Sequence, residues 1–366
     1  MAHPNPAGKN RRSRDEVQMV VEAVNKCGGN ISKAARELNA RGIGLSRLAV
    51  MRAYRKAMAA RGIQKAAQLD PYKPFEVAPL PSELPSAEEL IERRKRQYTT
   101  KSEAEEARRL ISVKVKIGGP IGIVHMGDPH VDDDGTDIGL LEKHVNVINR
   151  TEGLFGANVG DMSNNWVGRL ARLYGEQSTS AAESWVLVDW FVNSVQWLYM
   201  VGGNHDCWSG AGDPIKWMLR NQQGVYEAWG VRMNLQFPNG KAVRINARHD
   251  FSGHSMWNPN HGPMKAVNMG WRDHILTCGH KHEAFVTGPQ KCPSTGLLSW
   301  AVRCGTYKVH DRYGKEKGLP DQCPFSAAVT IIDPQYADDD NRLITVFTNV
   351  EEGAEYLTWK RMRAAA

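Results

Sequence analysis

The chain has 366 residues, 41% of them hydrophobic, which is enough for two or three domains and a sizeable core. No apolar run reaches the roughly 18 residues of a membrane-spanning helix. None of the six cysteines forms a Cys-x-x-Cys pair, which argues against a zinc knuckle. We therefore expect a soluble, cytosolic protein with reduced thiols and no membrane partner.

The formal net charge of +7 is unevenly distributed along the chain. Residues 1–66 contain 14 Lys and Arg but 4 Asp and Glu, whereas the remaining residues have a slight acidic excess. This asymmetry indicates a polyanion partner for the N-terminal segment. A solvated basic surface is the alternative, and charge alone does not separate the two interpretations.

Three helices are predicted after a polar tail at residues 1–12. The first begins at Asp15 and continues to Gly28 and Gly29, with valines at helical spacing. The second covers residues 32–38 and the third residues 46–60. Residues 1–66 are therefore expected to form a small, basic, all-α domain.

This helical segment resembles a helix-turn-helix DNA-binding domain of the kind found in recombinases and phage regulators. Residues 28–38 are similar to the opening of such units, although the turn that follows is longer than the usual one. The resemblance implies that the third helix enters the major groove of DNA. The alternative is a helical cap that packs on the rest of the chain. The expected DNA contacts are Arg47, Arg52, Arg55 and Lys56.

A proline-rich linker and a charged helix are predicted over residues 67–111. Five prolines fall within residues 67–86, a composition typical of an extended linker. Ser86 and Glu89 form a capping-box pattern that opens a helix to about Leu110, with a break expected near Thr99. Its basic residues are best explained as a solvated face, with guidance of nucleic acid as the alternative.

Alternating strands and helices are predicted from Ser112 onward. Apolar runs typical of strands end just before polar motifs, and helical patterns fill two of the gaps. This order indicates an α/β sheet with functional side chains on loops at the strand ends. The predicted strands are 121–126, 155–159, 197–201, 243–247, 275–278, 326–332 and 343–350, and the helices are 139–150 and 181–195.

Four short motifs follow these strands: Asp128-Pro-His130, Gly160-Asp-Met-Ser-Asn164, Gly203-Asn-His-Asp206 and Gly279-His-Lys-His282. In this order they resemble the metal-binding signature of the calcineurin-like metallophosphoesterases. The resemblance covers roughly residues 112–350, and the corresponding domain is placed at 112–366. It implies a β-sandwich flanked by helices, with metals at the sheet ends.

The resemblance also implies a role for each motif residue. Two divalent metals would share a bridging carboxylate, and a histidine that is not a ligand would protonate the leaving oxygen. Asp206 would orient the ring of that histidine, His205. The implied ligands are Asp128, His130 and His282 on the first metal, Asp161 as the bridge, and Asn204 and His280 on the second metal.

A further second-metal histidine is expected between the third and fourth motifs. His249 follows a predicted strand, as the other ligands do, and is our choice. His254 and His261, in the following loop, are the alternatives. Outside the ligand set, Asn164 is expected either to be structural or to support the residues that bind the metals. The acidic run at 132–134 is interpreted as a solvated turn rather than additional ligands.

Other polar and aromatic residues are interpreted more simply. His125 and His144 match no motif position and are expected to be hydrogen-bonded polar residues. Trp208 and Trp257 lie near the motifs and could stack on a base. Core packing is preferred for both because the surrounding segment is rich in tryptophan.

These residues predict a two-metal phosphoester hydrolase. The mixed imidazole and oxygen ligands suit Mn²⁺, with Fe²⁺ or Zn²⁺ as alternatives. The expected substrate is nucleic acid, cleaved as by a nuclease or phosphodiesterase, with DNA bound by the N-terminal domain. The pairing of domains resembles phage and prophage proteins, which would place it in the host cytoplasm. The alternatives are a protein or nucleotide phosphomonoesterase, and a DNA-binding regulator with an inactive phosphoesterase domain.

Overall fold

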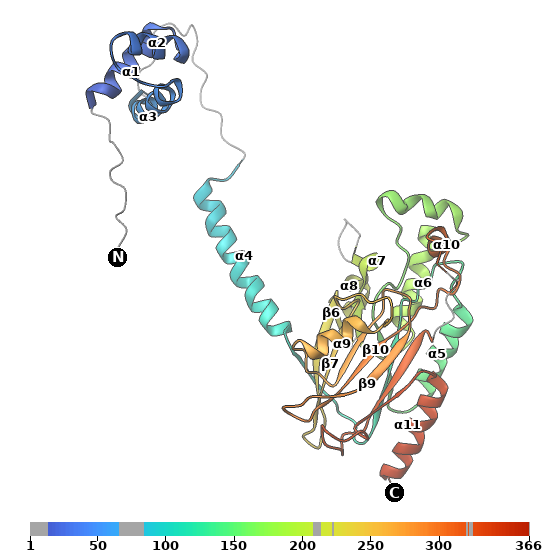
Figure 1. Cartoon of the computed structure of the whole chain (residues 1–366). Coiled ribbons are helices and arrows are strands. Elements are labelled where there is room, and N and C mark those ends of the chain that lie inside the picture. The colour runs from blue at the N-terminus through green and yellow to red at the C-terminus, as the bar shows by residue number, and fades with distance from the viewer. Residues whose placement is uncertain are drawn as a thin grey trace. The chain divides into compact units, whose positions relative to one another are not determined.

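The computed structural model describes residues 14–65, 84–207, 214–221, 223–319, 321 and 325–365. The chain divides into two compact units, Met1–Pro85 and Ser86–Ala366 (Figure 1). In the part of the chain that the structure describes, no helix is both long and apolar enough to cross a bilayer. The cysteines in that part, at positions 27, 207, 278, 292 and 304, are free thiols.

The first unit contains three helices: α1 (Arg14–Lys26), α2 (Ile31–Ala40) and α3 (Arg47–Lys65). The Asn30 side chain caps α2 by accepting a hydrogen bond from the backbone N–H of Lys33 at 3.0 Å. Small and branched apolar residues from all three helices form the core, so the helices can pack closely. The buried set is Val20, Ala23, Val24, Ala34, Ala35, Leu38 and Val50.

The second unit begins with α4 (Ala87–Arg108), which has no buried side chain. The predicted capping box is present, since Ser86 and Glu89 exchange hydrogen bonds between side chain and backbone. The break expected near Thr99 was a wrong prediction. Helix α4 continues through Thr99 to Arg108, and the Thr99 hydroxyl donates to the Lys95 carbonyl at 3.2 Å.

Two six-stranded sheets follow. The β2 sheet has the order β12-β11-β2-β3-β4-β5, and its strands β2 to β5 run parallel. Strands β11 and β12 continue it antiparallel. The bounds are β2 (Ile121–Met126), β3 (Leu154–Asn158), β4 (Trp197–Gly202), β5 (Val225–Ala228), β11 (Ala327–Ile332) and β12 (Ile344–Phe347).

The β8 sheet has the order β1-β6-β7-β8-β10-β9. Its central strands β7, β8 and β10 are parallel, and β6 and β9 pair antiparallel with β7 and β10. The edge strand β1 is parallel to β6. The bounds are β1 (Ile111–Lys114), β6 (Gly230–Gln236), β7 (Ala242–Arg248), β8 (Ile275–Cys278), β9 (Phe285–Lys291) and β10 (Leu298–Arg303).

The inner faces of the two sheets pack against each other. Ile123 and Tyr199 from the β2 sheet share one core with Met233, Ile245 and Val302 from the β8 sheet. Residues two apart on a strand point to the same face, so this core draws on alternate positions. The two sheets therefore form a β-sandwich.

Helices cover both outer faces of the sandwich (Figure 1). Against the β2 sheet pack α5 (Ile138–Arg150), α6 (Ala181–Asn193) and α11 (Val350–Ala365), through residues such as Leu141 and Phe191. Helix α9 (His261–Asn268) contacts β8 and β10. The predicted α/β fold, a β-sandwich flanked by helices, is confirmed.

The C-terminal segment differs from the prediction. The strand expected over residues 343–350 ends at Phe347, and Val350 starts α11 instead. Asn349 accounts for the switch, because its side-chain oxygen accepts from the Glu352 N–H at 3.0 Å, which is N-cap geometry. The remaining short elements are η1 (Gly168–Glu176), α7 (Asn204–Cys207), α8 (Pro214–Met218), η2 (Leu219–Asn221) and α10 (Arg312–Glu316).

Candidate metal centre

The motif residues come together at the carboxyl ends of five strands. Asp128, Asp161 and Asn204 follow the parallel strands β2, β3 and β4. His249 and His280 follow β7 and β8, which are parallel neighbours in the facing sheet. Because parallel strands end at one edge, each sheet delivers its polar loops to the same end of the sandwich.

One cluster of ligand atoms surrounds the ring nitrogen Nε2 of His249. This Nε2 atom lies 2.8 Å from Asn204 Oδ1, 3.0 Å from His280 Nδ1 and 3.2 Å from Asp161 Oδ2. The other ring nitrogen, Nδ1, is 2.9 Å from the Val159 carbonyl and donates to it. In a neutral ring Nε2 then carries a lone pair, so several electron-rich atoms converge on one point and fit a bound cation.

A second cluster lies on the other side of Asp161. The Nε2 atoms of His130 and His282 are 3.3 Å apart, and His282 Nε2 is 3.6 Å from Asp128 Oδ2. Within the described residues, the buried atoms Asp128 Oδ1 and His130 Nδ1 have no hydrogen-bond partner. A buried carboxylate oxygen without a partner is costly, and a metal would satisfy it.

Asp161 belongs to both clusters. Its carboxylate is within 4.8 Å of ligand atoms of His130 and His205, and equally within 4.8 Å of those of His249 and His280. A carboxylate shared in this way occupies the position that a bridging ligand requires. The donor set combines imidazole nitrogens, carboxylates and an amide oxygen, and therefore fits divalent transition metals.

The ligand loops have unusual backbone conformations. His130, Asp161, His280 and His282 have φ angles of 38°, 51°, 70° and 56°, in the left-handed region. Each non-glycine residue held there costs on the order of 1 kcal/mol or more. Such conformations persist where the surrounding structure imposes them, and they cluster at functional sites.

Close packing of these loops requires glycine at two positions. A Cβ atom on Gly203 would lie 2.2 Å from Asp161 Oδ1, and one on Gly279 would lie 2.6 Å from Asp128 Oδ1. Backbone hydrogen bonds hold the same carboxylates, since Asp161 Oδ1 accepts from His205 N at 2.9 Å and Asp128 Oδ2 accepts from His280 N at 2.6 Å. Gly203 and Gly279 are therefore steric requirements of the site.

Two buried carboxylates and a buried imidazole dominate the electrostatics of the site. Burial raises the pKa of Asp128 well above its usual range. Burial acts in the same direction on Asp161, but His249 and His205 outweigh it and hold the pKa of this carboxyl far below its usual value. Burial lowers the pKa of His249, but the Asp161 and Asp128 carboxylates reverse this and raise it to about 10. A proton on His249 thus provides positive charge that a metal would otherwise bring.

Burial lowers the pKa values of the remaining ligand imidazoles. It brings the pKa of His282 to about 4 and lowers those of His130 and His280. These three rings are therefore neutral at pH 7, the protonation state in which an imidazole binds a metal.

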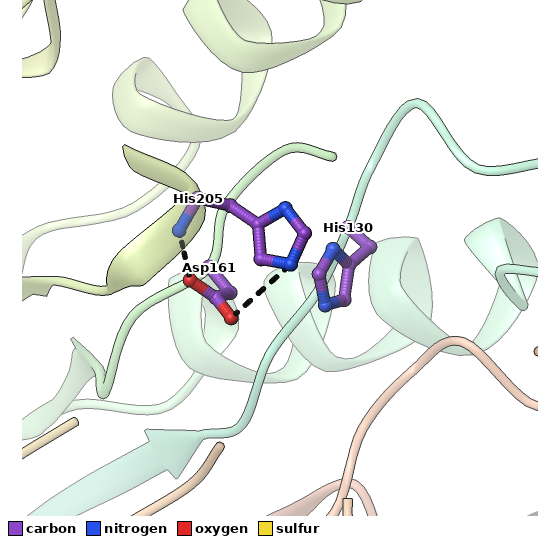
Figure 2. A group of neighbouring side chains, drawn as sticks. All are labelled: His130, Asp161 and His205. Carbon is purple, nitrogen blue, oxygen red and sulfur yellow. Dashed lines mark hydrogen bonds and ion pairs between the residues drawn. The ribbon is translucent and has the colours of Figure 1, made fainter. Parts of the chain in front are cut away.

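His205 lies next to the bridging position (Figure 2). Its Nε2 is 4.0 Å from Asp161 Oδ2, and its ring is nearly perpendicular to that of His130, with the centroids 5.0 Å apart. Its Nδ1 is hydrogen-bonded to the backbone carbonyl of Asn164. An Nδ1–H that donates there leaves Nε2 facing Asp161 and able to exchange a proton with a substrate oxygen.

Asp206 has a different position from the one expected. Its two carboxylate oxygens accept from the backbone N–H groups of Gly203 at 2.8 Å and Met162 at 3.0 Å. It therefore joins the loops that carry Asn204 and Asp161. The hydrogen bond that orients the His205 ring is made with the backbone carbonyl of Asn164, a residue that the sequence pattern places outside the ligand set as structural or supporting.

Of the three candidate histidines, His249 is the one whose ring lies among the ligand atoms of the first cluster. His254, by contrast, is exposed on the following loop, and His261 begins α9. His125 and His144 are hydrogen-bonded core residues, as expected: His125 contacts Tyr199 and Thr330, and His144 contacts Tyr307.

The acidic run and the tryptophans also have defined positions. Asp132 accepts from the Asn164 N–H at 2.7 Å, and Asp133 accepts from the Asn164 side chain at 2.7 Å, so both order the second motif. The prediction of core packing for Trp257 was wrong, because this side chain is 90% exposed. Trp208 lies outside the described residues.

Arg303 supports the site, and no motif in the sequence includes it. The guanidinium of Arg303, fully buried, donates to the carbonyls of Gly279 at 2.7 Å and Pro259 at 2.9 Å and to Asp250 at 3.0 Å. It thereby fixes the start of the fourth motif. Arg303 ends strand β10, and a charged residue at the end of an apolar strand was the available signal.

Comparisons with known proteins give similarity of structure but not of sequence. No protein-family model matches the chain, and no curated protein matches it. Among solved structures, the calcineurin-like phosphoesterase YfkN from Bacillus subtilis is 11% identical, with a TM-score of 0.36, and the match covers 67% of this chain and 97% of that one.

Two further structures have similar values. Vps29 from Entamoeba histolytica is 12% identical with a TM-score of 0.31, covering 62% of this chain and 97% of that one. The NAD nucleotidase NadN from Haemophilus influenzae is 10% identical with a TM-score of 0.33, covering 62% of this chain and 49% of that one. Because these TM-scores are low, we infer the fold and the site from the strand order and the side-chain contacts described above.

Proposed function

We propose that the second unit is a metal-dependent phosphoester hydrolase that acts on nucleic acid. The observation that carries this proposal is the position of Asp161 between two clusters of ligand atoms, with His205 beside it. Around it, the four motifs follow one another in the order that resembles the calcineurin-like metallophosphoesterases. The ligands that would hold the metals are Asp128, His130, Asp161, Asn204, His249, His280 and His282.

Phosphoester hydrolysis needs charge neutralisation and a source of nucleophile. Two bound divalent cations supply both, since they neutralise phosphate oxygens and lower the pKa of a water molecule. Mn²⁺ suits these ligands, and Fe²⁺ and Zn²⁺ are the alternatives. We propose Mn²⁺ as the bound metal.

The chain's own residues provide proton transfer and orientation. His205 would hold a proton at Nε2 and transfer it to the departing oxygen as the phosphorus–oxygen bond breaks. The Asn164 carbonyl fixes the ring of His205, and Asp206 fixes the loop behind it. Because this proton donor and its supports are intact, hydrolysis is favoured over a purely regulatory role.

DNA binding by the first unit is the second part of the proposal. Helix α3 contains no acidic residue, and its side chains Arg52, Arg55 and Lys56 are exposed on the face opposite buried Val50. Within the described residues, none of these three cations forms an ion pair with a carboxylate within 4.0 Å. Arg47 is also exposed, at the start of the helix. Exposed cations that are not in such ion pairs are available for phosphates.

Hydrolysis of a model diester tests the catalytic part. Metal-depleted full-length protein supplied with Mn²⁺ should cleave bis-p-nitrophenyl phosphate, and Asp161→Asn should not. Cleavage of p-nitrophenyl phosphate alone would indicate a phosphomonoesterase instead. Absence of cleavage of either compound would leave a DNA-binding regulator as the better interpretation.

A further inference from the structure

A cavity of about 290 Å³ lies beside the metal centre. Its walls come from the first motif loop, from Trp166 and the following η1, and from the segment after β10. The residues that matter here are Asp133, Trp166, Leu173, Glu176, Lys308 and Arg312. A volume near 300 Å³ is at the lower end of the range for small-molecule sites.

Three wall residues connect the cavity to the catalytic groups. The Trp166 ring meets the His205 ring edge-on, with centroids 5.1 Å apart and an interplanar angle of 73°. Asp133 accepts from the side chain of Asn164, and the backbone carbonyl of Asn164 is hydrogen-bonded to the His205 ring. The cavity is therefore on the His205 side of the site.

The third connection runs through a buried lysine. Lys308, 3% exposed, places Nζ 3.0 Å from Asp133 Oδ2 and 3.0 Å from Asp311 Oδ1. Asp311 Oδ2 is in turn 3.9 Å from Nδ1 of the ligand His282. The cation of Lys308 is thus already matched by two carboxylates and is not available as a free phosphate-binding charge.

The charges of the wall disfavour an anion. Asp133, Asp134 and Glu176 oppose two permanent cations, Lys308 and Arg312, so the wall is formally negative by one charge when His310 is neutral. Arg312 is paired with Glu176 at 3.1 Å. The apolar surfaces of Trp166 and Leu173, both less than a tenth exposed, instead suit a flat, uncharged group.

We propose that this cavity receives the leaving group of the phosphoester, and that this group is an uncharged nucleoside or aromatic alcohol without a further phosphate. The inference rests on the proposed hydrolase function and specifies its substrate class. Water would form a new bond to phosphorus and lose a proton, and the bond to the nucleoside oxygen would break. That oxygen would take the proton from His205 Nε2, and the proton lost by the water would restore it. Such a cavity favours cleavage at a chain end over cleavage inside a polynucleotide.

A pair of dinucleotides tests this preference in the full-length protein with Mn²⁺. In thymidylyl-thymidine (TpT) either scissile bond releases an uncharged thymidine, whereas in its doubly end-phosphorylated form (pTpTp) the leaving nucleoside always carries a phosphate. Initial rates followed by chromatography should give a kcat/KM at least about tenfold higher for TpT, because the acidic wall repels the added phosphate.

A matched pair of variants tests whether the preference for TpT over pTpTp arises at the cavity wall. Glu176→Gln removes one wall carboxylate and should narrow the TpT/pTpTp ratio about threefold or more, mainly through a lower KM for pTpTp. Glu152→Gln makes the same change at an exposed residue outside the cavity and should leave the ratio unchanged. The Glu176 side chain is partly exposed, so this substitution spares the core.

The outcomes separate the two levels of the proposal. Equal or faster cleavage of pTpTp by the unmodified protein, no cleavage of TpT by protein that cleaves bis-p-nitrophenyl phosphate, or an equal shift in both variants would overturn the cavity assignment alone. Failure to cleave any of these esters would overturn the proposed function and, with it, this inference.

Discussion

Nε2 of His249 and Oδ1 of Asn204 lie 2.8 Å apart, on loops that leave different sheets. Because His249 Nδ1 donates to the Val159 carbonyl, a neutral His249 would present a lone pair to the amide oxygen. Two acceptors at this distance need a positive charge between them, either a proton on Nε2 or a metal ion. Protons and metal ions should therefore compete at this position.

Metal affinity is expected to rise with pH for this reason. The Asp161 and Asp128 carboxylates outweigh burial and raise the pKa of metal-free His249 to about 10, so at pH 7 a metal must displace its proton. The apparent affinity for Mn²⁺ should increase by about tenfold per pH unit between pH 6.5 and 8.5 from this group alone. Calorimetric titration in buffers of different ionisation enthalpy measures the released proton. An affinity that does not change over this range would contradict the assignment of His249.

Replacing His205 should impair turnover without loss of metal. His205→Ala removes the proton donor, and kcat for a diester with a poor leaving group such as TpT should fall by about 10²–10⁴-fold. Mn²⁺ affinity should stay within a few-fold of the parent value. His254→Ala, on the exposed loop, is the control and should behave like the parent. Parent-like turnover by His205→Ala would show that another group supplies the proton.

Arg303 should matter for both stability and metal binding. Arg303→Met removes three hydrogen bonds from a buried guanidinium and should lower the free energy of unfolding by about 3 kcal/mol. The fourth motif would lose its support, and the affinity for Mn²⁺ should fall by about 10- to 100-fold.

An exposed arginine provides the control for this substitution. Arg342 pairs with Asp340 at 2.6 Å while 66% exposed, so Arg342→Met should leave the free energy of unfolding close to the parent value. Denaturant titration and metal titration of both variants measure the two effects. Equal metal affinity in the two variants would show that Arg303 acts on stability alone.

DNA binding should depend on the exposed cations of α3. Replacing Arg52, Arg55 and Lys56 together by Ala should weaken binding of duplex DNA and reduce the slope of log affinity against log salt by about 2 to 3. Fluorescence anisotropy across a salt series measures both quantities. A triple substitution at Lys114, Lys116 and Arg150, exposed on the second unit, is the control. Unchanged binding by the α3 variant would favour the interpretation of the first unit as a helical cap.

Much of the fold could be predicted because its signals are local. Strands such as β2 and β8 are short apolar runs that are followed by a glycine and a polar residue. The capping-box pattern of Ser86 and Glu89 predicts the start of α4. The start of α11 depends on a single cap at Asn349. The apolar run before it therefore predicts a strand that continues through Val350. The ends of elements thus followed side-chain hydrogen bonds that periodicity does not reveal.

The supporting contacts of the site could not be predicted because they join distant segments. Asn164 and His205 are 41 positions apart, and Lys308 meets Asp133 across a still longer separation. Neither pair forms a motif in the sequence. The prediction of core packing for Trp257 rests on composition alone. Composition does not indicate on which side of a loop a side chain lies, and this side chain is exposed.

The most direct test of the central claim is a Mn²⁺ titration of the metal-free, full-length protein, in parallel with Asp161→Asn. We expect two equivalents to bind to the parent chain, because Asp161 lies between two ligand clusters, and we expect affinity to fall by more than about 100-fold in the variant. Binding of no metal, or equal binding by both proteins, would contradict a two-metal centre at this edge of the sandwich.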